Sequence, residues 1–116
     1  RHNAYVVNKR GEVNRYPGVK RSIGDTDPEF MKRPFEEVSL VVESGDCLYM
    51  TTDGYESQLG GINNKKLKRY KMNDFFLKYK DYSMSEQKLS LLNELHDWKG
   101  ENEQTDDILM IGMRMA

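Results

Sequence analysis

The sequence predicts an α+β domain whose strands pair antiparallel. Four strand-like segments come first, two helix-like segments follow, and one strand-like segment ends the chain. Short turns join the first strands in pairs, and no regular βαβ alternation is present, so a Rossmann-type parallel sheet is excluded. The length of 116 residues and the 37% of hydrophobic residues suit one domain with a modest core.

The first strands form two predicted hairpins. Residues 4–8 and 13–16 are strand-like, and the turn "NKRGEV" between them contains Gly11, which supplies the positive φ of a tight turn. Residues 35–43 alternate in hydropathy and are followed by the turn "ESGD" and the apolar run of residues 47–52. We expect these two segments to pair as a hairpin, with residues 47–52 central in the sheet and covered on both faces.

An irregular segment separates the two hairpins. Residues 17–34 carry glycines, prolines and charges, with "SIGDTDPEF" among them. Loops of this length are usually functional or mobile. The polar run "SQLGGINNKK" predicts a second loop later in the chain.

Two helices are predicted in the second half of the chain. In "MNDFFLKYK" the aromatic residues follow helical spacing, and Asn73 is a candidate N-cap. Ser83 and Glu86 form a capping box that opens a helix over residues 84–98, and Gly100 is a stop signal. The predicted core stripe of this helix consists of Leu89, Leu92, Leu95 and Trp98, supported by Leu91, with Lys88 facing solvent.

Acidic residues stand at two strand ends. Asp53 follows the run 47–52 and precedes a glycine, and Asp106 and Asp107 precede the last predicted strand, residues 108–115. If these strands are antiparallel neighbours, Asp53 and Asp106 lie close together and need a cation or a proton between them. Oxygen ligands without nearby Cys or His suit Mg²⁺ or Mn²⁺. The competing interpretation is structural, because an Asp-Gly pair after a strand commonly makes a turn and an Asp-Asp pair before one commonly lies in a solvated loop.

The bulk composition excludes several classes of function. The net charge of −1 argues against a nucleic-acid-binding footprint, whereas a phosphoprotein partner needs only local positive charge. The single cysteine, Cys47, cannot form an internal disulfide and lies in an apolar pattern typical of a small buried residue. No run approaches the roughly 20 apolar residues of a membrane span, and no signal peptide is visible.

One basic cluster has two interpretations. Lys65, Lys66, Lys68, Arg69 and Lys71 lie within seven residues of one another. Such a cluster is commonly a solvated face, and its functional alternative is a docking patch for an acidic or phosphorylated partner. The two histidines, His2 and His96, have no plausible nucleophile partner, and we expect both on the surface.

Four motifs occur together in a recognisable order. "NAYVVNKRGEV" and "RSIGD" precede "ESGDCLYMTTDGY", and "QTDDILMIGMRM" closes the chain. The ordered set resembles the metal-dependent (PPM-type) serine/threonine protein phosphatases, specifically the bacterial SpoIIE-like branch. In that family an apolar strand leads to Thr/Ser-Asp-Gly, and an Asp-Asp pair precedes the last strand. The resemblance covers essentially the whole chain.

The resemblance implies an antiparallel β-sandwich with flanking helices and a binuclear Mn²⁺ or Mg²⁺ site. At the matching positions Asp53 and Asp106 are catalytic metal ligands, and Asp107 orients the ligand network from behind them. Water activated by the metals attacks phosphoserine or phosphothreonine without a covalent enzyme intermediate. The implied partners are a phosphorylated signalling protein, similar to an anti-sigma-factor antagonist, and an upstream sensor domain of the same parent chain.

The chain departs from the family pattern on its N-terminal side. The first family motif, an aspartate–glycine pair that bridges both metals, lies upstream of the matched part. We therefore expect residues 1–116 to be the C-terminal part of one phosphatase domain, inactive alone and carrying half of the ligands. Leu109 and Ala4 stand where threonine and proline are common. Because the early strands are missing, we expect exposed sheet edges and homodimers formed through them.

Two other interpretations stay open. The chain could be a non-catalytic interaction module derived from a degenerate phosphatase, or a small α+β domain whose acids only cap turns. The presence of Asp53, Asp106 and Asp107 favours the enzyme, because a degenerate site would be free to lose them. We expect a cytoplasmic location, and the sequence leaves open whether the parent protein is anchored in a membrane.

Overall fold

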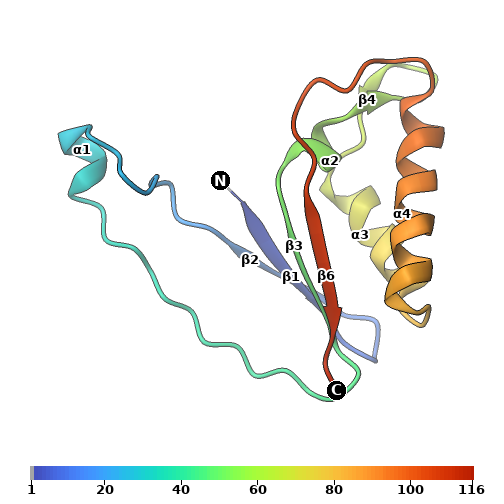
Figure 1. Ribbon diagram of the computed structural model, residues 1–116, viewed down its shortest axis with the longest axis horizontal. Coiled ribbons are helices and arrows are strands. Elements are labelled where there is room, and N and C mark those ends of the chain that lie inside the picture. The colour runs from blue at the N-terminus through green and yellow to red at the C-terminus, as the bar shows by residue number, and fades with distance from the viewer. Residues whose placement is uncertain (1) are drawn as a thin grey trace.

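The computed structural model describes residues 2–116 and confirms the predicted α+β class with an antiparallel sheet and flanking helices (Figure 1). The elements are β1 (Asn3–Val7), β2 (Val13–Pro17), α1 (Pro28–Met31), β3 (Cys47–Thr51), α2 (Gly54–Ser57), β4 (Leu59–Gly60), β5 (Lys65–Lys66), α3 (Arg69–Tyr79), α4 (Met84–Lys99) and β6 (Met110–Arg114). The strands form a four-stranded sheet in the order β2-β1-β3-β6 and a two-stranded sheet of β4 and β5. Within the described residues, no helix is long and apolar enough to cross a membrane.

The β1–β2 hairpin forms as the sequence predicts. The strands pair in register from Asn3 opposite Pro17 to Val7 opposite Val13. Gly11 takes the positive φ of +83° that the turn requires, and its amide donates to the carbonyl of Asn8 at 3.1 Å. The hairpin is therefore specified locally.

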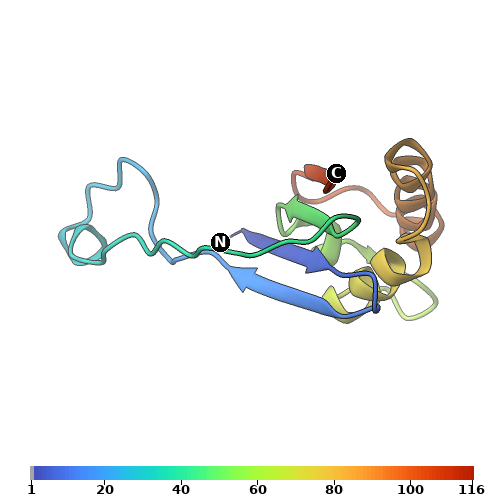
Figure 2. The ribbon, with the colours of Figure 1, turned by 90° about the horizontal axis from the view of Figure 1, so that it is seen from below.

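Helices α3 and α4 cover one face of the large sheet (Figures 1 and 2). The core lies between these two helices and the sheet. The centre of the core is aromatic: the ring of Tyr49 on β3 stacks on the ring of Phe76 on α3 at 4.1 Å, with Tyr5 on β1 at 5.8 Å from the same ring. Cys47 is buried in this core, as predicted. Burial raises the pKa of the Tyr49 hydroxyl, which donates to Gln87 on α4.

Both predicted signals at the ends of α4 are confirmed, but its predicted core stripe is wrong in part. Ser83 Oγ accepts from the amide of Glu86, and Gly100 ends the helix. The buried residues are Gln87, Leu91 and Leu95, whereas Leu89 is 61% and Leu92 42% exposed. A helix has 3.6 residues per turn, so a spacing of four residues departs less from a full turn than a spacing of three. Residues 87, 91 and 95 therefore stay on the face of α4 that is turned to the sheet.

The predicted start of α3 is also wrong. The helix begins at Arg69, and Lys68 rather than Asn73 holds the N-cap position, without a side-chain capping bond. Tertiary packing explains the earlier start, because Met72 in the first turn is fully buried together with Phe76. Residues before the aromatic run therefore join the helix to reach the core.

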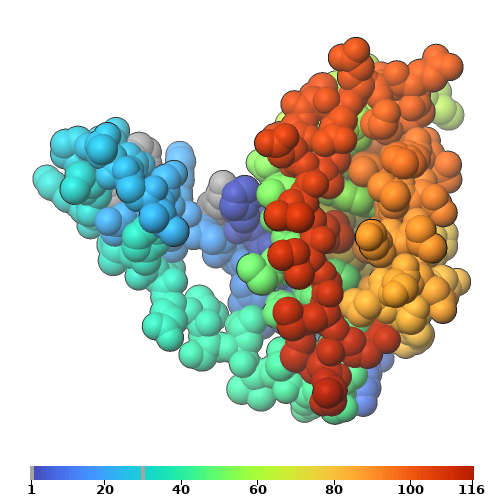
Figure 3. Space-filling model, in the orientation of Figure 1, coloured from blue at the N-terminus to red at the C-terminus, as the bar shows by residue number. Residues whose placement is uncertain are grey.

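The predicted hairpin of residues 35–43 with 47–52 does not form, which is a clear correction. Residues 35–43 contain no strand, and Val41 is 97% exposed. β3 pairs instead with β1 on one side and with β6 on the other, so both of its hydrogen-bonding edges are already used. The segment between β2 and β3 arches away from the body of the molecule (Figure 3). The Cα radius of gyration of 15.8 Å accordingly exceeds the about 13 Å of a compact domain of this length.

β3 is central in the sheet, as predicted, but only its helix-side face is covered. Met50 lies opposite Ile111, and Leu48 opposite Met113, so these apolar side chains share the helix-free face. Met50, Ile111 and Met113 are all exposed there. β6 also has no partner on its outer side within the described residues.

We expect this chain to self-associate through the open edge of β6 and the apolar face beside it. An unpaired strand edge flanked by exposed apolar side chains invites pairing with a second copy. Light scattering coupled to size exclusion should show a mass that rises above the 13.6 kDa monomer with concentration. The double change Ile111→Lys/Met113→Lys should restore the monomer, whereas Val41→Lys, on the arching segment, should not. A monomeric mass at every concentration would count against this interface.

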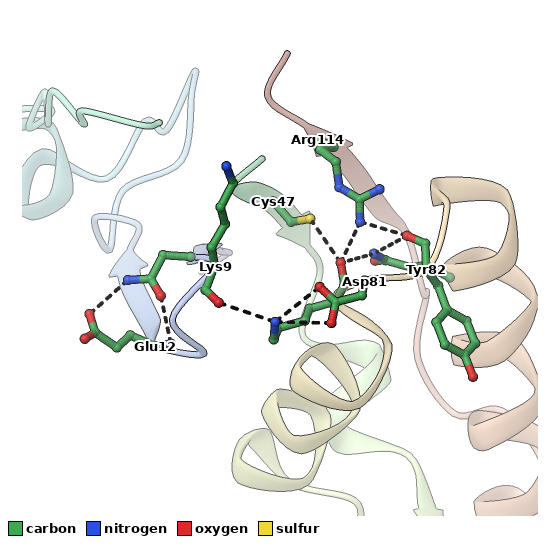
Figure 4. A network of polar contacts seen from close by, with 9 residues as sticks. Lys9, Glu12, Cys47, Asp81, Tyr82 and Arg114 are labelled. Carbon is green, nitrogen blue, oxygen red and sulfur yellow. Dashed lines mark hydrogen bonds and ion pairs between the residues drawn. The ribbon is translucent and has the colours of Figure 1, made fainter. Parts of the chain in front are cut away.

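The turn between α3 and α4 is tied to the sheet by a polar network (Figure 4). The carbonyl of Lys80 accepts from Arg114 on β6 at 2.5 Å and from Gln87 on α4 at 3.3 Å. Arg114 also donates to the carbonyl of Tyr82 at 2.7 Å. The helix layer and β6 are thereby held together at the end of the sheet opposite Asp53.

Candidate functional site

The two acidic segments meet at one rim of the sheet. Asp53 lies two residues after the end of β3, and Asp106 and Asp107 come shortly before β6. β3 and β6 are antiparallel neighbours with Thr51 opposite Met110, so the end of β3 lies beside the start of β6. The strand arrangement that the sequence argument required is therefore present.

The hydroxyl of Thr52 joins the two segments. It donates to the carbonyl of Asp107 at 2.9 Å and accepts from the amide of Leu109 at 3.0 Å. The amide of Thr52 donates to the carbonyl of Leu109 at 3.0 Å. Sequence reasoning missed this positioning residue, although a hydroxyl directly before Asp53 was the signal that could have indicated it.

Gly54 brings the two backbones into contact. A Cβ atom at this position would lie 2.2 Å from the carbonyl oxygen of Asp107 and 2.9 Å from Cγ1 of Ile108. Real Cβ atoms do not approach backbone so closely, so the glycine is required by packing. Gly54 thereby allows the backbone that carries Asp53 to lie against the Asp106–Asp107 segment.

The Asp53 carboxylate takes no part in capping. Asp53 occupies the N-cap position of α2, and its carbonyl accepts from the amide of Ser57 at 3.0 Å. Its side chain makes no capping hydrogen bond and is exposed. The interpretation of Asp53 as a side-chain cap is therefore not supported, and the carboxylate is available to a ligand.

Asp106 and Asp107 are exposed as well. One carboxylate oxygen of Asp106 accepts from the amide of Asp107 at 2.8 Å. The side-chain Nε2 of Gln104 donates to the main-chain carbonyl of Asp106 at 2.9 Å. These local bonds shape the turn that presents both acids ahead of β6.

Hydrogen bonds from α2 and its C-cap hold the rim in place. The hydroxyl of Tyr55 donates to the carbonyl of Leu91 on α4 at 2.6 Å, and burial raises the pKa of this hydroxyl. The side chain of Gln58, 1% exposed, donates to the carbonyl of Glu103 at 3.0 Å. Tyr55 therefore anchors α2 on α4, and Gln58, the C-cap of α2, ties the loop before the acidic segment to α2.

The donor set matches part of a hard-cation site. The residues that converge supply carboxylate and carbonyl oxygens without sulfur or imidazole, which suits Mg²⁺ or Mn²⁺. Within residues 2–116, no three His, Cys, Asp or Glu side chains are grouped so that they could hold a metal ion. Asp53 and Asp106 provide at most part of the ligand set of such a cation. His2 and His96 are exposed, as expected, and lie outside this set.

The chain matches the family model "Stage II sporulation protein E (SpoIIE)" over residues 3–116. The chain belongs to the SpoIIE family. Its expected membership of the SpoIIE-like branch is thereby confirmed.

A solved structure supports the fold of this SpoIIE chain. The SiaA-PP2C domain of Pseudomonas aeruginosa matches with a TM-score of 0.84 and 23% sequence identity. The match covers 99% of this chain and 43% of that chain, so this SpoIIE chain spans less than half of the matched structure. No match was found among curated proteins.

Proposed function

We propose that this chain is the C-terminal part of a metal-dependent protein serine/threonine phosphatase, with Asp53 and Asp106 as metal ligands. The observation that carries the proposal is the contact of Thr52 and Gly54 with the backbone of Asp107, which brings two distant acidic segments to one rim. Family membership supports the reaction class. Bound Mn²⁺ or Mg²⁺ would supply an activated water for attack on the phosphate ester.

The chain's own residues would prepare the site in three ways. The exposed carboxylates of Asp53 and Asp106 provide negative charge and oxygen donors for the cation. Asp107 would orient the ligand network with its carboxylate. Thr52 and Gly54 keep the two segments at a constant separation, so the ligands do not need to be reorganised when the metal binds.

The remaining part of the domain and the substrate belong to the same proposal. The matched structure is more than twice as long as this chain, which supports a larger domain that supplies the other ligands. The proposed substrate is a phosphorylated signalling protein similar to an anti-sigma-factor antagonist, controlled by an upstream sensor domain in a cytoplasmic setting. The chain alone should be inactive because it holds only part of the ligand set.

A manganese titration of the 116-residue chain tests this proposal. Calorimetry should detect weak Mn²⁺ binding that Asp53→Asn abolishes, because the amide removes the negative charge and one anionic donor while keeping the shape. The matched control is Asp81→Asn, which changes an exposed aspartate at the opposite end of the molecule. Hydrolysis of p-nitrophenyl phosphate by the chain alone should stay far below that of complete domains.

Two outcomes would contradict the proposal. Identical Mn²⁺ titrations of the parent and of Asp53→Asn would leave Asp53 without a metal role and favour the non-catalytic interaction module. Manganese-dependent hydrolysis by the chain alone, at the rate of a complete domain, would show that no ligands are missing.

A further inference from the structure

A cluster of basic residues lies on β5 and at the start of α3. It consists of Lys65, Lys66, Lys68, Arg69 and Lys71, here called the basic patch. All are exposed except half-buried Lys71, and within the described residues none forms a salt bridge. Ile62 is fully exposed and Tyr70 67% exposed, so apolar side chains accompany the charges. Exposed cations attract and orient an acidic partner, and exposed apolar side chains beside them add contact area.

The basic patch is anchored on the C-terminal end of α4. Gly60 and Gly61 pack against Trp98 so closely that a Cβ on Gly60 would lie 1.9 Å from the Trp98 carbonyl oxygen. The amide of Gly61 donates to that oxygen, and Trp98 Nε1 donates to the carbonyl of Gln58, each at 2.9 Å. Lys71 Nζ lies 4.1 Å from the centroid of the Trp98 ring. These contacts hold the hairpin of β4 and β5 in a fixed position on the end of α4.

The backbone of the patch is rigid as well. Leu67, 1% exposed, lies in the middle of the patch and donates its amide to Gln58 at 2.9 Å. Lys68 adopts a φ of +73°, which a side-chain-bearing residue rarely does, and its amide donates to the carbonyl of Glu56 at 2.8 Å. Strained backbone is maintained only where its surroundings impose it, and it clusters at functional sites. The cations are therefore presented on a preorganised support.

The patch adjoins the acidic rim. Glu56 and Gln58, to which it is hydrogen-bonded, follow Asp53 by three and five residues through the short helix α2. Figure 1 shows β4 beside the loop that leads from α4 to β6. A protein segment bound on the patch would therefore have a neighbouring residue within reach of Asp53.

From this arrangement we infer that the basic patch binds an acidic segment of the phosphorylated protein substrate and so positions its phosphoresidue at the rim. The inference rests on the proposed phosphatase function for the identity of the partner. The positive charge of the patch complements the negative charge of such a segment. Tyr70 and Ile62 provide apolar contacts for the same peptide.

An acidic peptide fits this surface better than a nucleic acid. Glu101 and Glu103 lie on the segment that borders the hairpin, and Gln58 Nε2 bonds to the carbonyl of Glu103. A long run of phosphates crossing the patch would meet these carboxylates and the acids of the rim. The acidic part of a short segment ends before it reaches them, and only the phosphoresidue that follows it extends to the rim.

The test is a binding measurement on the 116-residue chain without divalent metal. The probe is a fluorescein-labelled peptide with a run of glutamates on one side of a single phosphoserine, measured by fluorescence anisotropy. The charge reversal Lys65→Glu/Lys66→Glu should weaken binding roughly tenfold, because each change removes an attraction and adds a repulsion. The matched control is Lys9→Glu/Arg10→Glu in the exposed β1–β2 turn, which changes the net charge equally at the far end of the sheet. The neutral variant Lys65→Gln/Lys66→Gln should give an intermediate loss.

The outcomes separate this inference from the proposed function. Binding that salt weakens, that Lys65→Glu/Lys66→Glu lowers and that Asp81→Asn leaves unchanged supports the basic patch, whether or not manganese binds at the rim. Equal losses in the patch variant and in the control variant would overturn the inference, as would an absence of binding. Tighter binding of a DNA duplex, lost in the patch variant, would assign the patch to nucleic acid instead.

Discussion

Asp53→Asn and Asp106→Asn are each expected to lower the phosphatase activity of the complete domain more than about 100-fold. Replacing residues that only support a metal ligand already costs roughly 10–100-fold, so loss of a direct ligand should cost more. The measurement is kcat/KM with a phosphoserine substrate at saturating Mn²⁺. Excess metal should rescue neither variant fully, because the lost donor also positions the nucleophile.

Two further variants set the scale for this result. Asp107→Asn should fall within the roughly 10–100-fold range of a supporting residue. Asp81→Asn, whose side chain is 86% exposed beside Lys80, should behave as the parent. Full activity of Asp53→Asn, or an equal loss in all four variants, would contradict the assigned roles.

Gly54→Ala is expected to destabilise the chain by about 3 kcal/mol or more, the upper range for inserting an atom into a packed site. The added Cβ would meet the backbone carbonyl of Asp107 at 2.2 Å, and backbone tied to Thr52 cannot easily move away. For a chain of this length, such a loss lowers the melting temperature by on the order of 10 °C. Thermal melts followed by circular dichroism measure the shift.

The control for this clash is Gly24→Ala. Gly24 has a positive φ of +77°, but a Cβ there would have no neighbour within 4 Å. Its replacement should cost only about 1 kcal/mol, the strain of the left-handed backbone less the gain from a stiffer unfolded chain. If Gly54→Ala had the same melting temperature as Gly24→Ala or as the parent, the close approach of the two acidic segments would be disproved.

Local signals explain which elements were predicted correctly. The turn at Gly11 and the cap at Ser83 depend on neighbours a few residues away, and both form as expected. The position of Asp53 at the end of a strand was likewise visible in the order of residues, because the apolar run stops there. The candidate site could therefore be placed in sequence terms before any contact was known.

Long-range choices explain the errors. The segment 35–43 has strand-like alternation, yet β3 takes β1 and β6 as its partners, and no free edge of β3 is left for it. On α4 the leucines at 89 and 92 were expected in the core, but the face turned to the sheet is set by the packing of Gln87, Leu91 and Leu95. Asn73 was a reasonable cap by residue type, but burial of Met72 extends α3 toward the N-terminus.

From its order of residues alone, this chain specified its caps and tight turns, its α+β class, its family resemblance and the positions of the acids that we propose as metal ligands. Three things emerged only on folding: which strands are neighbours, which helix faces are buried, and how Thr52 and Gly54 join two acidic segments more than 50 residues apart. The reason is physical. Caps and turns are satisfied by hydrogen bonds within a few residues, whereas strand pairing and face selection are decided by competition among all segments for the same edges and the same core.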